Sequence, residues 1–439
     1  MPKASSLKDV INYFDSQNPL PKNDPWFVDT KRKEIEIIKN AFLESNRSLK
    51  FLLGGHPGNG KSTELNKMDN DEEINAKYLV VKYSANEVLD LNDVNVIDLL
   101  LTLIFKILEK VEEKNISLPD NLFNQLKDME GFFTDKLKIE KTTTNARQGK
   151  IGMGVEAKLG SSFPLVGLMA TCFAKMQLES ETRKKTREEY NPKITELQKL
   201  INDIIRTIKV SLKPPQFDIL LIVDDMDKIR PEQAEKLFSE EGSVIGGIQC
   251  SALLTLPISM IYSPKSGIIV SKIGQQKVLR NLRLKDKHGN EDESTKEHKD
   301  ILRQIVFKRM EENLIEKDAL DSAIMMSGGI FSTMIDLITS AASYSRVNNG
   351  TKIDIIDMQE AINEERANKK RALNRTYYDI LLEIHDYKKP LSTNRVETLE
   401  LFHSLFALEY MNGEEWCDIH PLLIEDVKEY KTIKQNEQA

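Results

Sequence analysis

The chain has 439 residues, and 62 Lys and Arg against 69 Asp and Glu give it a net charge of −7. That acidic balance excludes a protein that coats nucleic acid through overall charge, although a local basic patch remains open. An apolar fraction of 40% excludes a fibrous or wholly disordered chain. Three cysteines without a CxxC pair exclude a disulfide scaffold and a zinc knuckle, and no apolar run reaches the roughly 20 residues that cross a bilayer. We therefore expect a cytoplasmic protein that makes no membrane contact.

Apolar runs predict four buried strands, and helical spacing predicts the segments between them. The strands are residues 49–53, 78–83, 218–223 and a fourth region, 252–262, which Pro257 interrupts. Helices are predicted at residues 30–43, at 94–111 and along a charged pattern at 176–210, in which Asn191-Pro192 is the expected start of a helix. Ser294 and Glu297 fit a capping box that opens a further helix.

A phosphate-binding pattern follows the first predicted strand. Residues 55–62 are Gly55, His56, Pro57, Gly58, Asn59, Gly60, Lys61 and Ser62, which satisfy G-x-x-x-x-G-K-[ST] between a strand and a helix-forming segment. The glycines let the backbone wrap around phosphates, and its N–H groups attract the anionic oxygens. Lys61 is expected to reach the β- and γ-phosphates, and the Ser62 hydroxyl to ligate Mg²⁺. These residues and the adjacent Thr63 form the predicted nucleotide site, in which the His56 side chain points away from phosphate.

Two carboxylates follow the third predicted strand. Asp224 and Asp225 stand at the tip of the apolar run 218–223, where P-loop proteins hold Mg²⁺. Asp224 is expected to act on the metal directly or through water, and Asp225 to orient or deprotonate the attacking water. The alternative is an ordinary strand end with solvated acids.

One motif points to a different nucleotide. Residues 66–69, NKMD, match the N-K-x-D pattern that reads guanine, but they follow the phosphate loop on the same predicted helix. No DxxG follows Val223 either. The context therefore favours ATP over GTP.

Together, the two motifs resemble the P-loop ATPases of the AAA+ and STAND groups, with the origin-recognition and KAP-like branches nearest, over about residues 27–374. The resemblance implies an α/β P-loop NTPase fold: a three-layer α/β/α core with a parallel sheet, a helical insertion, a helical lid and a C-terminal winged-helix-like domain. Phe27-Val28-Asp29 and Lys31-Arg32 look like a weakened form of the box that packs near adenine in those families, with Asp29 in place of the usual glycine.

The resemblance also suggests nucleotide sensors. Residues 327–332, SGGIFS, are similar to the lid motif SGGxxR, whose arginine senses the γ-phosphate, but Ser332 stands at that position, and a plain helix junction explains the glycines equally well. Thr255 is the candidate for a polar strand-end residue near the γ-phosphate, with simple packing as the alternative. Arg230, Arg280 and Arg283 are conceivable arginine fingers, and a solvated surface arginine is the alternative for each.

Spacing predicts the domain organisation. Lys61 and Asp224 are 224 − 61 = 163 residues apart, which predicts a helical insertion at about residues 115–215 within an ATPase core of residues 1–300. In that insertion, GKIGMGVEAKLG is either a partner-contacting hairpin or a connection, and the cationic run Arg183, Lys184, Lys185 and Arg187 is assigned to a solvated helix face. Residues 301–374 would form the lid. Residues 375–439 would form the winged-helix-like domain, with two helices and a hairpin turning at Asn412-Gly413.

These residues predict an ATPase that uses Mg²⁺ and acts as a switch or motor, coupling its nucleotide state to conformational change or partner assembly. Two alternatives stay open: a nucleotide-bound signalling scaffold with negligible turnover, and a DNA-binding regulator of a mobile-element or antiviral defence system. A protein partner and a nucleotide-dependent homo-oligomer are expected. Glu397, Glu400 and Glu409 in the C-terminal domain favour protein contact at least as much as DNA contact.

Overall fold

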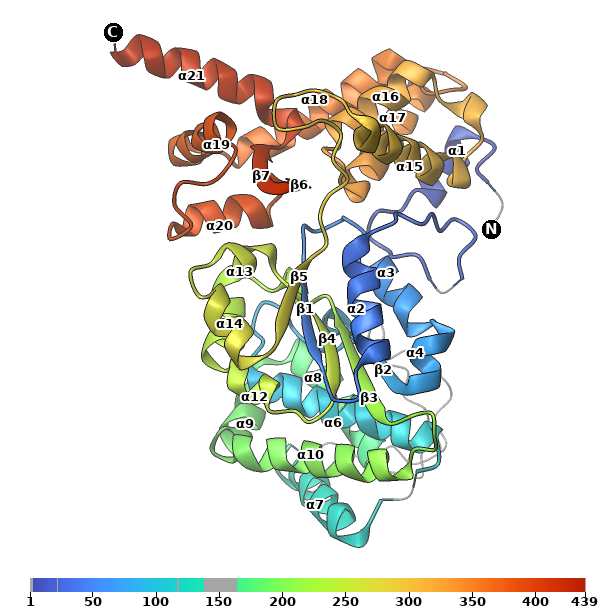
Figure 1. The fold of residues 1–439 in the computed structure, drawn as a ribbon, viewed down its shortest axis with the longest axis vertical. Coiled ribbons are helices and arrows are strands. Elements are labelled where there is room, and N and C mark those ends of the chain that lie inside the picture. The colour runs from blue at the N-terminus through green and yellow to red at the C-terminus, as the bar shows by residue number, and fades with distance from the viewer. Residues whose placement is uncertain (1–2, 22, 117, 138–163, 439) are drawn as a thin grey trace.

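The computed structural model describes residues 3–21, 23–116, 118–137 and 164–438. Its centre is a five-stranded sheet with the strand order β2-β3-β4-β1-β5, in which all pairings are parallel. The strands are β1 (Lys50–Gly54), β2 (Tyr78–Ser84), β3 (Asp218–Asp224), β4 (Ser251–Leu256) and β5 (Gln275–Val278). Parallel pairing brings the carboxyl ends of β1, β3 and β4 to one edge of the sheet, next to the start of α3 (Lys61–Asp69) (Figure 1).

The first three predicted strands are confirmed, each to within a residue of its bounds. The fourth region is only half strand: β4 ends before Pro257, and residues Ile258–Tyr262 form the short helix α13. No apolar pattern indicated β5, because QQKV is polar and lies partly exposed at the sheet edge.

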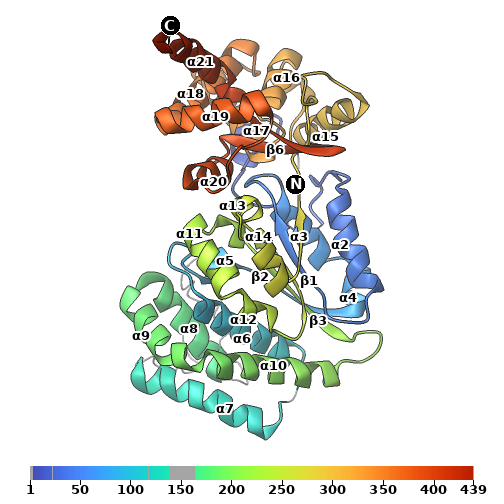
Figure 2. The same cartoon turned by 60° about the vertical axis from the view of Figure 1, so that its left-hand side comes forward.

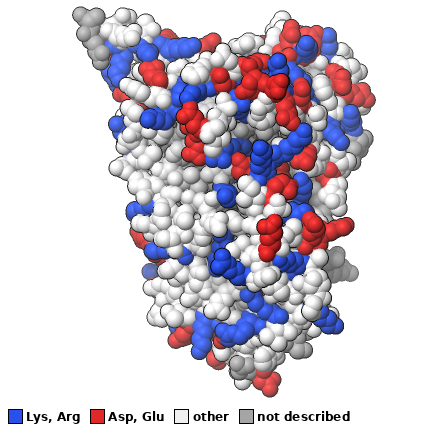
Figure 3. Space-filling model, viewed as in Figure 1, with Lys and Arg blue, Asp and Glu red and all other residues white. Residues whose placement is uncertain are grey.

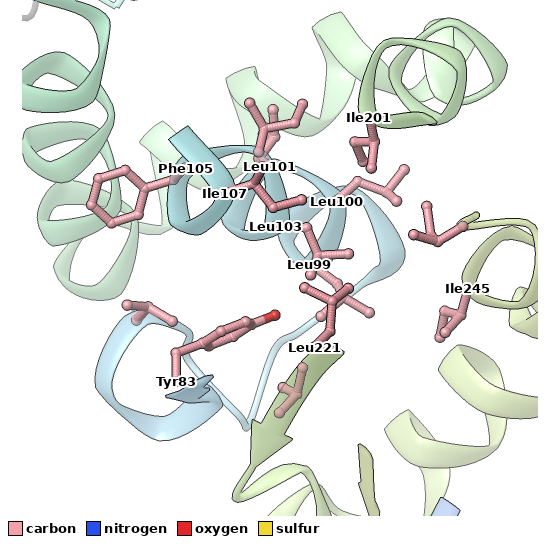
Figure 4. Packing of buried hydrophobic residues seen from close by; sticks show 14 of the residues in the cluster. Tyr83, Leu99, Leu100, Leu101, Leu103, Phe105, Ile107, Ile201, Leu221 and Ile245 are labelled. Atoms are coloured by element: carbon pink, nitrogen blue, oxygen red, sulfur yellow. The ribbon is translucent and has the colours of Figure 1, made fainter. Parts of the chain in front are cut away.

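Helices cover both faces of the sheet and make the three-layer core that the sequence predicted. One face packs against α2 (Lys33–Glu44), α3 and α4 (Glu72–Lys77), which contribute Ile38, Leu65 and Ile74 to a common cluster. The other packs against α6 (Val96–Glu113) and α10 (Ile194–Ser211). Figure 4 shows the leucines of α6 lying between Leu221 of β3 and Ile201 of α10. Strands buried on both faces explain why they appear in the sequence as continuous apolar runs.

The remaining elements of the core are short and connect the strands. They are α5 (Ala85–Val88), η3 (Met226–Lys228), α11 (Pro231–Ala234), η4 (Glu235–Glu240), α12 (Gly242–Gly246) and α14 (Ser266–Lys272).

The predicted insertion contains α7 (Asp120–Gly131), η1 (Phe132–Lys136), α8 (Pro164–Leu178) and α9 (Ser180–Tyr190), followed by η2 (Asn191–Lys193) and α10. A new helix does begin inside the charged pattern at 176–210, as the Asn191-Pro192 pair predicted. Its N-cap is Lys193 rather than Asn191, because a 3-10 turn comes first. GKIGMGVEAKLG lies outside the described residues.

The cationic run on α9 is solvated only in part. Lys184 and Lys185 are exposed beside glutamates, as predicted. Arg187 instead turns inward, where its Nη2 lies 2.5 Å from Oδ2 of the buried Asp98 on α6, and Arg183 pairs with Asp90 and Asp93. The prediction of a solvated face was wrong for the two arginines, whose partners lie about 90 residues earlier in the chain.

Four long helices form a bundle at the end of the molecule opposite the insertion (Figures 1 and 2). They are α15 (Glu293–Arg309), α16 (Lys317–Met326), α17 (Phe331–Val347) and α18 (Ile355–Arg371), with η5 (Glu312–Leu314) between the first two. We call residues 293–371 the lid. The N-terminal α1 (Leu7–Tyr13) packs into its core through Leu7 and Val10. The capping box of α15 is formed by Asp292 and Thr295 rather than by Ser294 and Glu297, so that prediction was wrong by two residues.

A compact C-terminal module, residues 375–438, lies beside the lid. It contains α19 (Arg375–Tyr387), α20 (Val396–His403), the hairpin β6 (Ala407–Asn412) and β7 (Glu414–Ile419), η6 (Pro421–Leu423) and α21 (Ile424–Gln438). Gly413 turns the hairpin with a φ of 76°, as the Asn412-Gly413 pair predicted. Among the described residues, no helix combines the length and apolar character that a membrane crossing would need.

Candidate nucleotide-binding site

The phosphate loop joins β1 to α3 and is shaped by glycines. Gly55, Gly58 and Gly60 have φ angles of 145°, 72° and 90°, a region that side chains with a Cβ rarely adopt. Two of these glycines also allow the lid to approach closely. A Cβ on Gly58 would lie 1.8 Å from Oγ of Ser332, and the Ser332 N–H donates to the Gly58 carbonyl at 3.1 Å. The predicted lid motif therefore lies directly on the phosphate loop.

Lys61 lies under this loop in a fully buried position. Its ammonium donates to the carbonyls of Gly55 and His56 at 2.9 and 2.8 Å and lies 2.8 Å from Oδ2 of Asp227. Asp227 was not among the predicted site residues. The only signal for it was a third acid in the run DDMDK, which η3 folds back toward the loop.

Asp224, Asp225 and Asp227 form an acidic cluster at the end of β3, with carboxylate oxygens within 4.8 Å of one another. Burial, together with the charges of the neighbouring Asp225 and Asp227, raises the pKa of Asp224 to about 6, while the Ser62 hydroxyl opposes this shift by hydrogen bonding to the carboxylate. Carboxylate and hydroxyl oxygens are the ligands that Mg²⁺ prefers. The predicted ligands Ser62 and Asp224 therefore lie together, and the excess negative charge around them suits a divalent cation.

Asp225 adopts a left-handed backbone conformation, with a φ of 64°. The Ser84 hydroxyl at the end of β2 donates to its Oδ2 at 2.6 Å, and Nζ of Lys228 lies 2.7 Å from its Oδ1. No local pattern pointed to Ser84, which the parallel register places opposite Asp224.

Thr255 at the end of β4 is completely buried and anchors the acidic turn. Its Oγ1 accepts hydrogen bonds from the backbone N–H groups of Met226 and Asp227, at 2.9 and 3.3 Å. This contact gives Thr255 a role in positioning the acids, whereas contact with the γ-phosphate stays a prediction.

The other loop residues anchor the loop to its surroundings. Asn59 Nδ2 donates to the Leu279 carbonyl at 2.6 Å, and the Thr63 hydroxyl accepts from the Leu20 N–H at 3.3 Å. The His56 side chain points away from the loop, as expected, and enters the C-terminal module, where its Nδ1 lies 3.2 Å from the Phe402 carbonyl oxygen.

The predicted adenine box contributes one buried charge. Arg32 is 7% exposed, and within the described part of the chain its guanidinium nitrogens have no hydrogen-bond partner. Its guanidinium lies 5.0 Å from the ring centroid of Phe331 at the start of the lid helix α17. Burial lowers the pKa of Arg32 to about 10, against the opposing effect of Glu64. Lys31, by contrast, is exposed and pairs with Glu297.

The three arginine candidates have different environments. Arg230 is exposed. Arg280 pairs with Glu34 of α2 and Glu415 of β7, and Arg283 is 4% exposed and pairs with Asp292. The prediction of a solvated surface position is therefore wrong for Arg283. Arg280 is engaged in ion pairs with acids of its own chain.

A parallel sheet whose first strand leads into a glycine-rich loop, a buried lysine and a facing acidic strand end defines a P-loop NTPase. Comparison by sequence agrees: residues 32–240 match the family model described as the KAP family P-loop domain. The chain thus has a P-loop NTPase fold, and residues 32–240 are similar to the P-loop domains of the KAP family. No curated protein matches the chain by sequence.

Solved structures with similar folds are distant in sequence. The ADP form of the Aeropyrum pernix ORC2 protein has 13% identity and a TM-score of 0.43, and the match covers 98% of both chains. Cdc6p from Pyrobaculum aerophilum has 12% identity and a TM-score of 0.40 over 94% of this chain and 97% of its own. The Thermotoga maritima RuvB Holliday junction branch migration motor has 13% identity and a TM-score of 0.36 over 91% and 93%.

Proposed function

We propose that the chain binds ATP with Mg²⁺ at Gly55–Thr63 and hydrolyses it to ADP and phosphate, acting as a nucleotide-dependent switch. The observation that carries this proposal is the position of Lys61, which lies under the phosphate loop and 2.8 Å from the carboxylate of Asp227. A buried ammonium beside a glycine-rich loop and a group of carboxylates suits a polyphosphate bound with a divalent cation.

Binding would begin with an exchange of partners at Lys61. Its ammonium would leave the carbonyls of Gly55 and His56 for phosphate oxygens, while the loop N–H groups surround the same anion. Ser62 and Asp224 would hold Mg²⁺, which neutralises phosphate charge when bound. Catalysis of this kind comes mainly from positioning and electrostatic stabilisation.

Asp225 would orient the attacking water and accept its proton at a carboxylate oxygen. Ser84 and Lys228 fix the carboxylate, one at each oxygen. Because both carboxylate oxygens already have partners, Asp225 would have to give up one of these contacts to receive a proton, which favours slow turnover. This observation supports the alternative of a nucleotide-bound signalling scaffold with little hydrolysis.

The lid would be the first part of the molecule to respond to a change in nucleotide state. The Ser332 N–H donates to the Gly58 carbonyl and the Phe331 ring lies against Gly60, so a change in loop conformation would move the start of α17. Surface charge supports a protein partner more than DNA, since both signs are interspersed on the face in Figure 3, and Glu397 and Glu400 lie on α20.

Equilibrium binding of ATP and ADP with Mg²⁺, together with phosphate release, tests the proposal. Lys61→Ala should abolish nucleotide binding, while Lys67→Ala, a charge loss on the exposed side of the same helix, should not. Asp225→Asn should spare binding and slow phosphate release. Full ATP affinity in Lys61→Ala would refute the site, and wild-type binding without phosphate release would establish the scaffold instead of the ATPase.

A further inference from the structure

The C-terminal module docks directly on the phosphate loop through His56. The Nδ1–H of His56 donates to the Phe402 carbonyl at 3.2 Å, and its Nε2 accepts the Glu409 N–H at 3.0 Å. Only the neutral imidazole with its proton on Nδ1 satisfies both contacts. Burial, helped by the charge of Lys61, lowers the pKa of His56 to about 3, so this form is present at physiological pH.

Further contacts surround this histidine and make a continuous interface. Tyr262 of α13 stacks on Phe402 of α20, with ring centroids 4.2 Å apart and planes 13° apart, and its hydroxyl lies 3.2 Å from Sγ of Cys417. Arg280 reaches Glu415 on the hairpin at 2.7 Å. Figures 1 and 2 both show α20 directly above α13. We call this interface the docking seam; it contains His56, Tyr262 and Arg280 on the core side and Phe402, Glu409, Glu415 and Cys417 on the module side.

The seam is connected to the phosphate site within a single residue. The module binds the side chain of His56, while the backbone carbonyl of the same residue accepts a hydrogen bond from Lys61 at 2.8 Å. Gly55 and Gly58 flank this part of the loop with positive φ angles, and without a Cβ these positions resist distortion little. The two hydrogen bonds to His56 therefore restrain an otherwise soft loop.

A second module residue faces the same region. His403 follows Phe402, and its Nδ1 is buried with no hydrogen-bond partner among the described residues. Lys61 and Asp227 are close enough for their charges to act on His403. The end of α20 thus lies near the ion pair at the base of the phosphate site.

We propose that docking of the module on His56 holds the phosphate loop in its nucleotide-binding conformation, so that module docking and nucleotide binding favour each other. The inference rests on the proposed nucleotide site. A docked module retains the nucleotide, and an undocked module leaves the loop free to release it. Because binding free energies are linked, a bound nucleotide must stabilise the docked module by the same factor.

Cys417 gives a direct measure of docking in the full-length protein. It is 3% exposed and lies against Tyr262, whereas Cys172 and Cys250 are buried elsewhere, in α8 and beside β4. Alkylation with iodoacetamide, followed at each cysteine by mass spectrometry, measures opening of the seam against the two internal references. Saturating ADP with Mg²⁺ should slow alkylation of Cys417 by about tenfold, within the usual range of coupling between two sites, and leave Cys250 unchanged.

Variants separate the seam from general stability. Arg280→Ala should speed alkylation of Cys417 and raise the ADP dissociation rate. Arg303→Ala, which breaks ion pairs to Asp300 and Asp321 inside the lid, should change neither. His56→Gln keeps one donor and one acceptor, so it should preserve ADP affinity better than His56→Leu does. If His56 only filled space, the two variants would have the same ADP affinity.

Three outcomes would overturn the inference. Wild-type protein that binds ADP but shows unchanged or faster Cys417 alkylation would refute the positive linkage alone, and equal ADP dissociation from wild type and Arg280→Ala would do the same. Wild-type protein that binds no ADP would refute the proposed function, and the linkage with it.

Discussion

Replacing Glu409 with glutamine should stabilise the protein at alkaline pH. Glu409 is 2% exposed in the docking seam, its Oε2 has no hydrogen-bond partner among the described residues, and its Oε1 lies 3.7 Å from Nε of Arg280. Burial, with the nearby charge of Glu415, raises the pKa of Glu409 from 4.5 to about 7, although Arg280 opposes this. Ionised Glu409 is therefore poorly compensated.

The sign and size of the effect follow from this pKa. Because the pKa is higher in the folded state, Glu409 stabilises the fold while it is protonated, and that contribution is lost as the pH rises from about 4.5 through 7. A pKa shift of this size lowers the free energy of unfolding by about 3 kcal/mol above pH 8 and by about 1 kcal/mol at pH 5. Glutamine never ionises, so Glu409→Gln should be more stable than wild type by about these amounts.

Urea unfolding followed by tryptophan fluorescence tests the prediction at pH 5 and pH 8.5. Trp416 lies in the same module, stacked on Tyr410 with ring centroids 4.7 Å apart, and Trp26→Phe would remove the other tryptophan of the chain. Glu414→Gln is the matched control, because that side chain lies on the same hairpin, is 62% exposed and pairs with Lys287, so its replacement should bring no gain in stability at pH 8.5. Equal or lower stability of Glu409→Gln at pH 8.5 would show that the buried carboxylate is well paired, and would refute the reasoning.

Three further predictions concern the site and the insertion. Thr255→Val should cost about 1–3 kcal/mol, because buried N–H groups lose their acceptor, and should slow phosphate release, whereas Thr255→Ser should retain both; identical behaviour of the two variants would contradict the anchoring role. Gly58→Ala should cost about 1–3 kcal/mol through overpacking against Ser332, and a second change, Ser332→Gly, should recover part of the loss in urea unfolding. Arg187→Ala should cost about 3–5 kcal/mol by leaving Asp98 buried without its partner. The double variant Arg187→Ala with Asp98→Asn should melt at a higher temperature than Arg187→Ala alone. Equal melting temperatures would contradict the buried ion pair.

The sequence predicted the parts of the site that depend on neighbouring residues. The glycine spacing of the loop, the apolar run before it and the acids after 218–223 all act over a few residues, so the motif and its strand context could be recognised together. The hairpin at Asn412-Gly413 was predictable for the same reason. By contrast, β5 carried no apolar signal, because an edge strand exposes part of its surface.

Partners that lie far apart in the chain could not be predicted from local patterns. Ser84 and Asp225 are 141 residues apart and meet only because β2 and β3 pair in a particular register. Arg183 and Arg187 look like surface cations in their own helix, and only the packing of α9 on α6 turns them toward buried acids.

Local sequence was enough to predict a phosphate loop between a buried strand and a helix, and acids at the end of a second buried strand, because glycine torsions and apolar burial are local properties. The groups that surround that loop depend on tertiary packing. The contact between His56 and Glu409 spans 353 residues, and it exists because the lid and module fold back over the carboxyl ends of the strands. Which distant groups fill the space above a loop depends on the packing of whole elements, which no single segment encodes.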